Sequence, residues 1–171
     1  MRNLEALIRT IPDFPKKGIL FRDITTLLEN GDALRQVTDI FRKNTPAGVN
    51  KLVAIESRGF IFGAMLALEL GVGFIPVRKG GKLPGETIKA KYDLEYGTDI
   101  LEIHKGAVLK GDRVVLIDDL LATGGTALAS CRLIEKCGGT VEKILFLIEL
   151  DGLAGSKKLD GYSIFSLLHF S

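Results

Sequence analysis

The feature that most constrains this chain is the stretch from Arg113 to Ala127, which reads RVVLIDDLLATGGTA. Its first part, Val114 to Ile117, is an unbroken aliphatic run, which is typical of a strand covered on both faces in a parallel sheet. Asp118 and Asp119 follow directly, at the carboxyl end of the strand, where open α/β sheets bind their ligands. The stretch therefore predicts an α/β fold with a ligand site at this edge.

The residues after the acidic pair have the composition of an anion-binding loop. They are Ala122, Thr123, Gly124, Gly125 and Thr126, and a helix is predicted to begin near Ala127. Adjacent glycines permit positive φ and let backbone N–H groups approach a ligand without an intervening Cβ. The helix N-terminus adds unpaired donors and a positive dipole end, and the threonine hydroxyls are further donors. We therefore expect this loop to hold a phosphate.

Together the two halves favour a sugar phosphate. Carboxylates accept hydrogen bonds from sugar hydroxyls and repel phosphate, so a ribose 5-phosphate would satisfy both Asp118 and Asp119 and the glycine loop. The alternative is that the acids merely start a loop that the glycines turn. We favour the ligand site because strand, acids, glycines, hydroxyls and helix occur in order. The pattern is neither a P-loop, which needs Gly-Lys-Ser/Thr, nor a G-x-G-x-x-G dinucleotide fingerprint.

Two other predicted strands also end in charge. Leu52 to Ile55 is followed by a polar turn with a glycine and then a helix, so Ser57 and Arg58 in that turn could form a second anion site. On the residues alone, Arg58 could equally pair with Glu56 or Asp23.

The strand from Gly73 to Val77 is followed by Arg78, Lys79 and Lys82. Such a cluster is usually a solvated turn. Beside two strand ends that already have anion-binding character, we expect these cations to serve one highly charged ligand.

Residues 87–103 alternate imperfectly and turn at Gly97, which predicts a β-hairpin. A long polar insertion between core strands is a candidate lid. Glu95 and Tyr96 lie near its bend, where the residues alone would make them ordinary hairpin surface. His104 could contact a leaving phosphate when the lid closes, although a lone exposed histidine more often has no role.

Strand–turn–helix units recur around Ile55, Val77, Ile117 and Leu150, which predicts a twisted, mainly parallel sheet flanked by helices. The remaining expectations are helices over Asn3–Ile11, Asp32–Lys43 (with Asp32 as N-cap) and Ala127–Lys136, an extended segment over Ile19–Ile24, strands over Val141–Leu150 and Ile164–Leu168, and a surface loop over Asp151–Asp160. His169 has no evident partner in the sequence.

Composition indicates a soluble globular protein. The chain has 171 residues, 46% hydrophobic and 26% charged, which predicts one domain with a sizeable core. A net charge of +2 gives no case for nucleic acid or membrane partners, and no apolar run reaches bilayer length. Cys131 and Cys137 are spaced so that they do not face each other on a helix, so we expect free thiols in the cytoplasm. No His, Cys and Asp cluster has metal-ligand spacing.

The stretch DDLLATGGT resembles the ribose-phosphate signature of type I phosphoribosyltransferases, and it is most similar to the members of that family that act on adenine. The resemblance runs from about Ile11 to Leu168. It implies one domain over residues 1–171, with a small N-terminal hood at about 11–28 and a β-hairpin lid at about 79–106. It also implies a homodimer, in which a neighbour could contribute Arg78, and Mg²⁺ carried on the substrate.

The resemblance also implies roles for individual residues. The pyrophosphate set is Ser57, Arg58, Arg78, Lys79, Lys82 and His104. Glu95, or less readily Asp118, would move the purine proton, and Tyr96 would lie over the ribose. The adenine set is Leu20, Phe21, Arg22 and Leu150.

The implied reaction transfers the phosphoribosyl group of phosphoribosyl pyrophosphate to adenine, releasing pyrophosphate and AMP. Enzymes of this fold that take xanthine, hypoxanthine or guanine typically carry a lysine and a Lys-Pro-Asp-aromatic segment after the last core strand. Residues 146–151 here read FLIELD instead, which favours adenine. A non-catalytic phosphoribosyl-pyrophosphate sensor is the main alternative, since it would not need Glu95. A flavodoxin-like receiver is disfavoured because it has no use for a Gly-Gly-Thr cradle.

Overall fold

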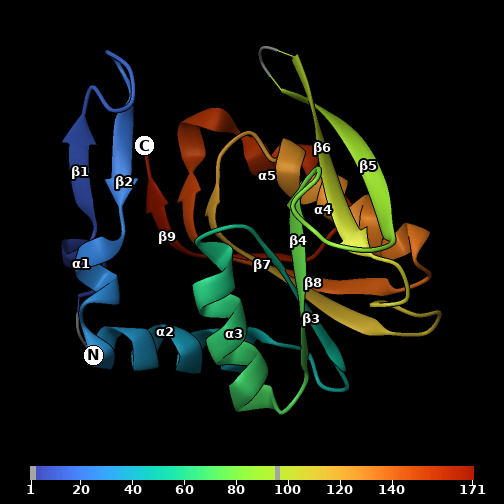
Figure 1. Ribbon diagram of the computed structural model, residues 1–171. Helices are drawn as coiled ribbons and strands as arrows, with labels where there is room; N and C mark the ends of the chain where they lie inside the picture. The colour runs from blue at the N-terminus through green and yellow to red at the C-terminus, as the bar shows by residue number, and fades with distance from the viewer. Residues whose placement is uncertain (1–2, 95–96) are drawn as a thin grey trace. The chain divides into compact units, whose positions relative to one another are not determined.

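The computed structural model describes residues 3–94 and 97–171, and the chain divides into two compact units, Met1–Ile40 and Phe41–Ser171. The first unit contains η1 (Glu5–Leu7), β1 (Arg9–Pro12), β2 (Leu20–Asp23), α1 (Thr25–Leu28) and most of α2 (Gly31–Asn44), as Figure 1 shows. The second contains β3 (Lys51–Ile55), α3 (Gly59–Leu70), β4 (Gly73–Lys79), β5 (Thr87–Leu94), β6 (Gly97–His104), β7 (Arg113–Leu121), α4 (Gly125–Lys136), β8 (Thr140–Leu150), η2 (Asp151–Leu153), α5 (Gly155–Lys158) and β9 (Ile164–Phe170).

The first unit is built on an antiparallel pair of β1 and β2. The helix expected over Asn3–Ile11 is therefore wrong: a 3-10 turn at Glu5–Leu7 ends at Ile8, and β1 begins at the next residue. The β-branched Thr10 and Ile11 favour extended backbone, and the residue before Pro12 is disfavoured in a helix. The helix over Asp32–Lys43 is confirmed as α2, but the side chain of Asn30 accepts the Ala33 N–H at 3.1 Å and so acts as its cap.

Asp23 joins β1, β2 and α1 within this unit. Its carboxylate accepts hydrogen bonds from the Thr25 hydroxyl at 2.7 Å and the Thr25 N–H at 2.9 Å, and from Arg9 Nε at 3.0 Å. These hydrogen bonds, chiefly those from Thr25, outweigh the effect of burial and lower the pKa of Asp23 to about 2.

The second unit contains a seven-stranded sheet in the order β5-β6-β4-β3-β7-β8-β9 (Figure 1). Strands β4, β3, β7, β8 and β9 pair in parallel, and β6 pairs antiparallel with both β4 and β5. The mainly parallel sheet is thus confirmed. The chain leaves β3 toward β4 and leaves β7 toward β8, in opposite directions, so the order of the sheet reverses between β3 and β7. Ligands of open α/β sheets bind at such a reversal.

The buried strands pack closely against α3. Leu52, Val53 and Leu116 are fully buried, as the aliphatic runs predicted. A Cβ added at Gly63 of α3 would lie 2.6 Å from Cβ of Ala54 in β3, so the missing side chain lets this helix approach the sheet. Close packing here fixes the turn between β3 and α3 that carries Ser57 and Arg58.

Strand β7 is longer than the aliphatic run that predicted it. It continues to Leu121, and Asp118 pairs with Phe146 of β8. Its pairing with β3 ends at the Ala54–Ile117 pair, so Asp118 is the first residue of β7 beyond that ladder. The edge of β7 therefore becomes available to a ligand at the acidic pair.

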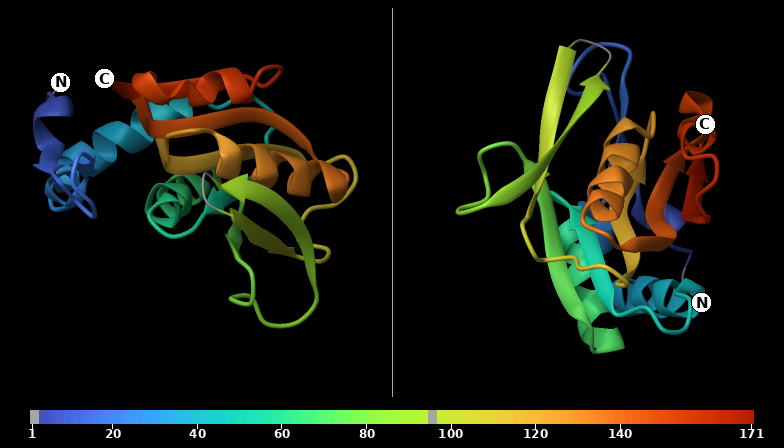
Figure 2. Two further views of the ribbon diagram at one scale, coloured as in Figure 1. Left: turned by 90° about the horizontal axis from the view of Figure 1, so that it is seen from above. Right: turned by 90° about the vertical axis from the view of Figure 1, so that its right-hand side faces the viewer.

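Strands β5 and β6 form the expected hairpin, which lies at the opposite edge of the sheet from β9 (Figure 2). The predicted bend residues Glu95 and Tyr96 lie outside the described residues. The loop expected over Asp151–Asp160 instead contains η2 and α5, with Gly155 and Leu159 buried. None of the helices within residues 3–94 and 97–171 is long and apolar enough to cross a membrane.

Candidate active site

A cavity of about 390 Å³ lies at the carboxyl ends of β3 and β7. Its lining includes Glu56, Ser57, Arg58, Lys79, Tyr92, Asp118, Asp119 and Thr126. These residues come from the turn after β3, the end of β4, the hairpin, β7 and the loop after it. The structure therefore gathers at one place three of the charged segments that the sequence marked separately.

Within this cavity, Asp118 and Asp119 differ in their partners. The Asp119 N–H donates to Oδ1 of Asp118 at 2.8 Å, and Oδ2 of Asp119 lies 2.7 Å from Nη2 of Arg58. Burial, and next the negative charge of Asp119, raise the pKa of Asp118 well above its ordinary value. Burial also raises the pKa of Asp119, and Arg58 opposes that rise. A buried acidic pair with perturbed pKa values is typical of a functional site.

The loop after β7 forms a second, smaller cavity of about 90 Å³, lined by Asp118 and by every residue from Leu120 to Ala127. Helix α4 begins at Gly125, and Gly124 has a φ of 78°, a conformation that glycine adopts readily. The N–H groups of the first helical turn have no acceptor within the helix. This geometry suits a phosphate, as predicted for residues Ala122 to Thr126.

The backbone of the loop after β7 contacts the backbone of Gly155. The sequence had predicted that Gly155 lies in a surface loop. A Cβ at Gly155 would lie 2.1 Å from the Ala122 carbonyl oxygen, and a Cβ at Gly124 would lie 2.6 Å from the Gly155 carbonyl oxygen. Two backbones thus meet at a distance that only glycine allows. Gly155 lies more than thirty residues away in the chain, so no local pattern points to it.

The cations near the cavity all contact protein carboxylates. Arg78 Nε lies 2.9 Å from Glu56 Oε2, Lys82 Nζ lies 3.4 Å from Glu56 Oε1, and Lys79 Nζ lies 3.2 Å from Asp99 Oδ2. The sequence offered Glu56 and Asp23 as partners of Arg58. The structure instead pairs Arg58 with Asp119, while Asp23 pairs with Arg9.

Tyr92 of β5 is a cavity residue that sequence reasoning missed. Its hydroxyl donates to Oδ2 of Asp99 at 3.4 Å. Burial raises the pKa of Tyr92, and a hydrogen bond with Thr126, in the turn into α4, opposes that rise. Ile88, Ala90 and Tyr92 all pack toward the core, so the alternation of the strand could have placed Tyr92 on the inner face.

Other expected site residues lie elsewhere. The ring Nε2 of His104 is 3.0 Å from the Pro84 carbonyl oxygen, and His104 is not among the residues lining the cavity described above. Leu20, Phe21 and Arg22 belong to β2 in the first unit, whereas Leu150 ends β8 in the second. Arg22 Nη1 donates to the Thr10 hydroxyl.

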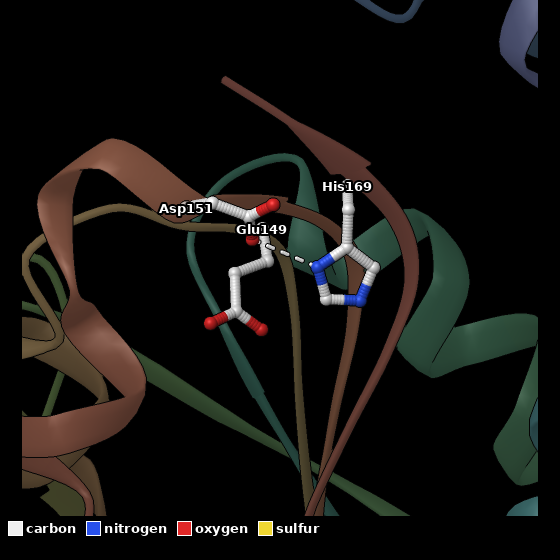
Figure 3. Close-up of side chains that lie close together, drawn as sticks. All are labelled: Glu149, Asp151 and His169. Carbon is white, nitrogen blue, oxygen red and sulfur yellow. Dashed lines mark hydrogen bonds and ion pairs between the residues drawn. The ribbon is translucent and has the colours of Figure 1, made fainter.

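His169 has a partner, contrary to expectation (Figure 3). Its Nδ1 lies 2.8 Å from Oδ1 of Asp151, which raises the pKa of His169. Glu149 faces His169 across the β8–β9 ladder and accepts a hydrogen bond from the Ser166 hydroxyl at 2.6 Å. One possible metal-ligand atom from each of Glu149, Asp151 and His169 lies within 4.8 Å of the other two.

Comparisons with known proteins agree with this geometry. The phosphoribosyl transferase domain family matches residues 23–168. An adenine phosphoribosyltransferase of Thermoanaerobacter sp. (strain X514) is 57% identical over 171 residues, covering 99% of each chain.

Solved structures give the same result. The crystal structure of adenine phosphoribosyltransferase from Thermoanaerobacter pseudethanolicus has a TM-score of 0.94 at 56% identity and 98% coverage of each chain. The Saccharomyces cerevisiae enzyme, crystallised with an imino-altritol bisphosphate and adenine, has a TM-score of 0.92 at 42% identity and 96% coverage of each chain. The chain described here therefore belongs to the phosphoribosyltransferase family, and within it to the adenine phosphoribosyltransferases.

Proposed function

We propose that this protein is a purine salvage enzyme of the cytoplasm that transfers the phosphoribosyl group of 5-phosphoribosyl 1-pyrophosphate to adenine. The products are AMP and pyrophosphate. The observation that carries the proposal is the juxtaposition of a phosphate loop, an acidic pair and a set of cations where the strand order reverses. The full-length likeness to adenine phosphoribosyltransferases supports adenine as the base.

The ribose 5-phosphate occupies the β7 side of the site. Its phosphate accepts hydrogen bonds from the backbone of residues 122–126 and from the hydroxyls of Thr123 and Thr126. Its ribose hydroxyls donate to Asp118 and Asp119, which line the adjoining cavity. In this proposal the anomeric carbon lies between the acidic pair and the cations of the β3 and β4 turns.

The pyrophosphate occupies the β3 and β4 side. Arg58 and Lys79 line the cavity, and Ser57, Arg78, Lys82 and His104 complete the set. As the bond from the anomeric carbon to pyrophosphate breaks, these groups neutralise the charge that develops on the leaving group. Mg²⁺ carried on the substrate would supply further neutralisation, and the oxygen ligands of Asp118 and Asp119 are of the type that this ion prefers.

Two further requirements concern the ribosyl cation and the purine proton. Asp118 and Asp119 face the positive charge that develops on the ribose, which they stabilise electrostatically. Closure of the hairpin with Glu95 and Tyr96 excludes water from the cation. Glu95 accepts the purine proton as general base, and Asp118 is the second candidate for that role.

The base and the assembly complete the proposal. Leu20, Phe21 and Arg22 in the first unit, and separately Leu150 in the second unit, are the residues proposed to contact adenine, by packing and backbone hydrogen bonds. The working unit is a homodimer, in which a neighbouring subunit supplies a cation such as Arg78.

The test is a base-panel assay with phosphoribosyl pyrophosphate and Mg²⁺ that follows pyrophosphate release. We expect turnover with adenine to exceed turnover with hypoxanthine, guanine or xanthine by more than about a hundredfold, because a site that hydrogen-bonds one base rejects a base that leaves its polar groups unpaired. Comparable turnover of all bases would contradict the base assignment. Binding of phosphoribosyl pyrophosphate without release of pyrophosphate for any base would favour a sensor instead.

A further inference from the structure

Glu56 is a buried carboxylate beside the pyrophosphate side of the cavity, and the proposed reaction gives it no role. It is the first residue after β3, immediately before Ser57 and Arg58, and its side chain is 6% exposed. A buried carboxylate is costly unless charged partners or hydrogen bonds compensate it. Its partners therefore indicate what it does.

All of these partners lie at the end of β4 or in the turn that follows. Glu56 Oε1 accepts the backbone N–H of Lys79 at 2.7 Å and lies 3.4 Å from Nζ of Lys82. Glu56 Oε2 accepts Nε of Arg78 at 2.9 Å. Arg78 in turn donates through Nη1 to the Lys82 carbonyl oxygen at 3.1 Å. One carboxylate thus fixes the whole cationic segment.

The geometry also keeps Glu56 charged. Burial raises its pKa, but hydrogen bonds from the Lys79 N–H and the Arg78 guanidinium, together with Lys82, lower the pKa overall. A negative charge beside an anion site weakens the long-range attraction for that anion. Long cationic side chains, however, lose much rotamer freedom when they bind a ligand. Fixing them beforehand reduces that cost.

We propose that Glu56 is a positioning residue for pyrophosphate: it holds Arg78 and Lys82, and the Lys79 backbone, in the orientation in which their side chains receive the leaving group. Glu56 acts through these cations and does not contact the substrate itself. The inference rests on the proposed function, which gives these cations to pyrophosphate.

The experiment compares Glu56→Ala and Glu56→Gln with the unmodified enzyme. The readouts are KM for phosphoribosyl pyrophosphate, KM for adenine, kcat, and the affinity for inorganic pyrophosphate by calorimetry. Glu56→Ala should weaken the binding of both phosphoribosyl pyrophosphate and pyrophosphate by about tenfold or more. This is the usual effect of losing a charge-assisted hydrogen bond. KM for adenine should change by less than about twofold.

Glu56→Gln separates geometry from charge. Its amide oxygen can still accept the Lys79 N–H, although it cannot pair with two cations, so its effect should be smaller than that of Glu56→Ala. In an Arg78→Ala background, Glu56→Ala should have a reduced effect, because contacting residues are not additive. The matched control is Glu142→Gln. Glu142 pairs with Arg113 Nε at 2.8 Å, where β7 begins, and its loss should leave all four readouts unchanged.

Two outcomes would overturn the inference, and a melting-temperature measurement interprets the second. Tighter pyrophosphate binding by Glu56→Ala would mean that Glu56 only competes with the anion. Unchanged affinities would mean that the cations need no positioning, and a lower melting temperature with unchanged affinities would mean a purely structural role. The calorimetric arm uses pyrophosphate alone, so it still tests Glu56 if the base-panel assay fails to show transfer.

Discussion

Arg58 Nη2 lies 2.7 Å from Oδ2 of Asp119, and this ion pair joins the turn after β3 to the end of β7. In the proposed mechanism the two residues bind opposite halves of the substrate: the guanidinium suits pyrophosphate, and the carboxylate suits the ribose hydroxyls. Because each holds the other, this ion pair fixes the separation between the β3 turn and the end of β7. Such preorganisation is the usual source of catalytic positioning.

Asp118→Asn should stabilise the fold at neutral pH while reducing activity. The pKa of Asp118 is raised by burial and by the negative charge of Asp119. The ionised carboxylate therefore lowers the free energy of unfolding. This destabilisation is fully present above the folded-state pKa of Asp118, and it vanishes below the unfolded-state pKa of about 4. At pH 8 the free energy of unfolding of the variant should be higher by on the order of 1 kcal/mol, and its melting temperature by about 2–4 °C. Both differences should disappear as the pH approaches 4. Thermal denaturation across this range, alongside KM for phosphoribosyl pyrophosphate, measures both effects. A lower melting temperature of the variant at pH 8 would contradict the prediction that ionised Asp118 destabilises the fold.

Gly155→Ala should damage the phosphate loop without touching the substrate. The new Cβ would lie 2.1 Å from the Ala122 carbonyl oxygen, a backbone atom that cannot rotate away. Overpacking of this kind costs about 1–3 kcal/mol, so KM for phosphoribosyl pyrophosphate should rise by about tenfold or more. The control is Gly152→Ala, where an added Cβ meets nothing within 4 Å. Equal kinetics in the two variants would show that the loop does not depend on this contact.

Asp23→Asn should weaken the protein at neutral pH but not in strong acid. The pKa of Asp23 is lowered to about 2, so its contribution to stability is present above the unfolded-state pKa of about 4 and is lost as pH falls through about 2. Hydrogen bonds to a charged group contribute about 1.5–3 kcal/mol, and the variant should lose an amount of that order at pH 7. Urea denaturation at pH 7 and pH 2 should show a difference only at the higher pH.

Local pattern was enough to predict the sheet. The aliphatic runs of β3, β7 and β8 identify strands covered on both faces, because a strand buried on one face only would alternate. The turn into α4 was also predictable, since Gly124, Gly125 and the helix behind them are adjacent in sequence. These features share one property: the residues that determine them are close together in the chain.

What the sequence did not predict depends on distant partners. The periodicity of Leu4, Leu7 and Ile8 favoured a helix, but pairing with β2 determined the backbone of β1. The support that Gly155 gives to Ala122 depends on the path of the chain after β8. The choice of ion pairs, such as Glu56 with Arg78, depends on which strand ends become neighbours in the sheet.

Glu95→Gln should separate catalysis from binding. If Glu95 accepts the purine proton, kcat should fall by about a hundredfold or more, the usual contribution of a general base. The affinity for phosphoribosyl pyrophosphate should change little, because the residue acts on the base. Single-turnover kinetics and equilibrium binding provide the two measurements. Unchanged turnover would remove Glu95 from this role and favour Asp118.

The most direct measurement is a crystal structure of the protein with AMP bound. We predict that the 5′-phosphate accepts hydrogen bonds from the backbone N–H groups around Gly124 and Gly125, and that the ribose hydroxyls donate to Asp118 and Asp119. A phosphate bound away from that loop, or ribose hydroxyls that make no contact with either aspartate, would contradict the account.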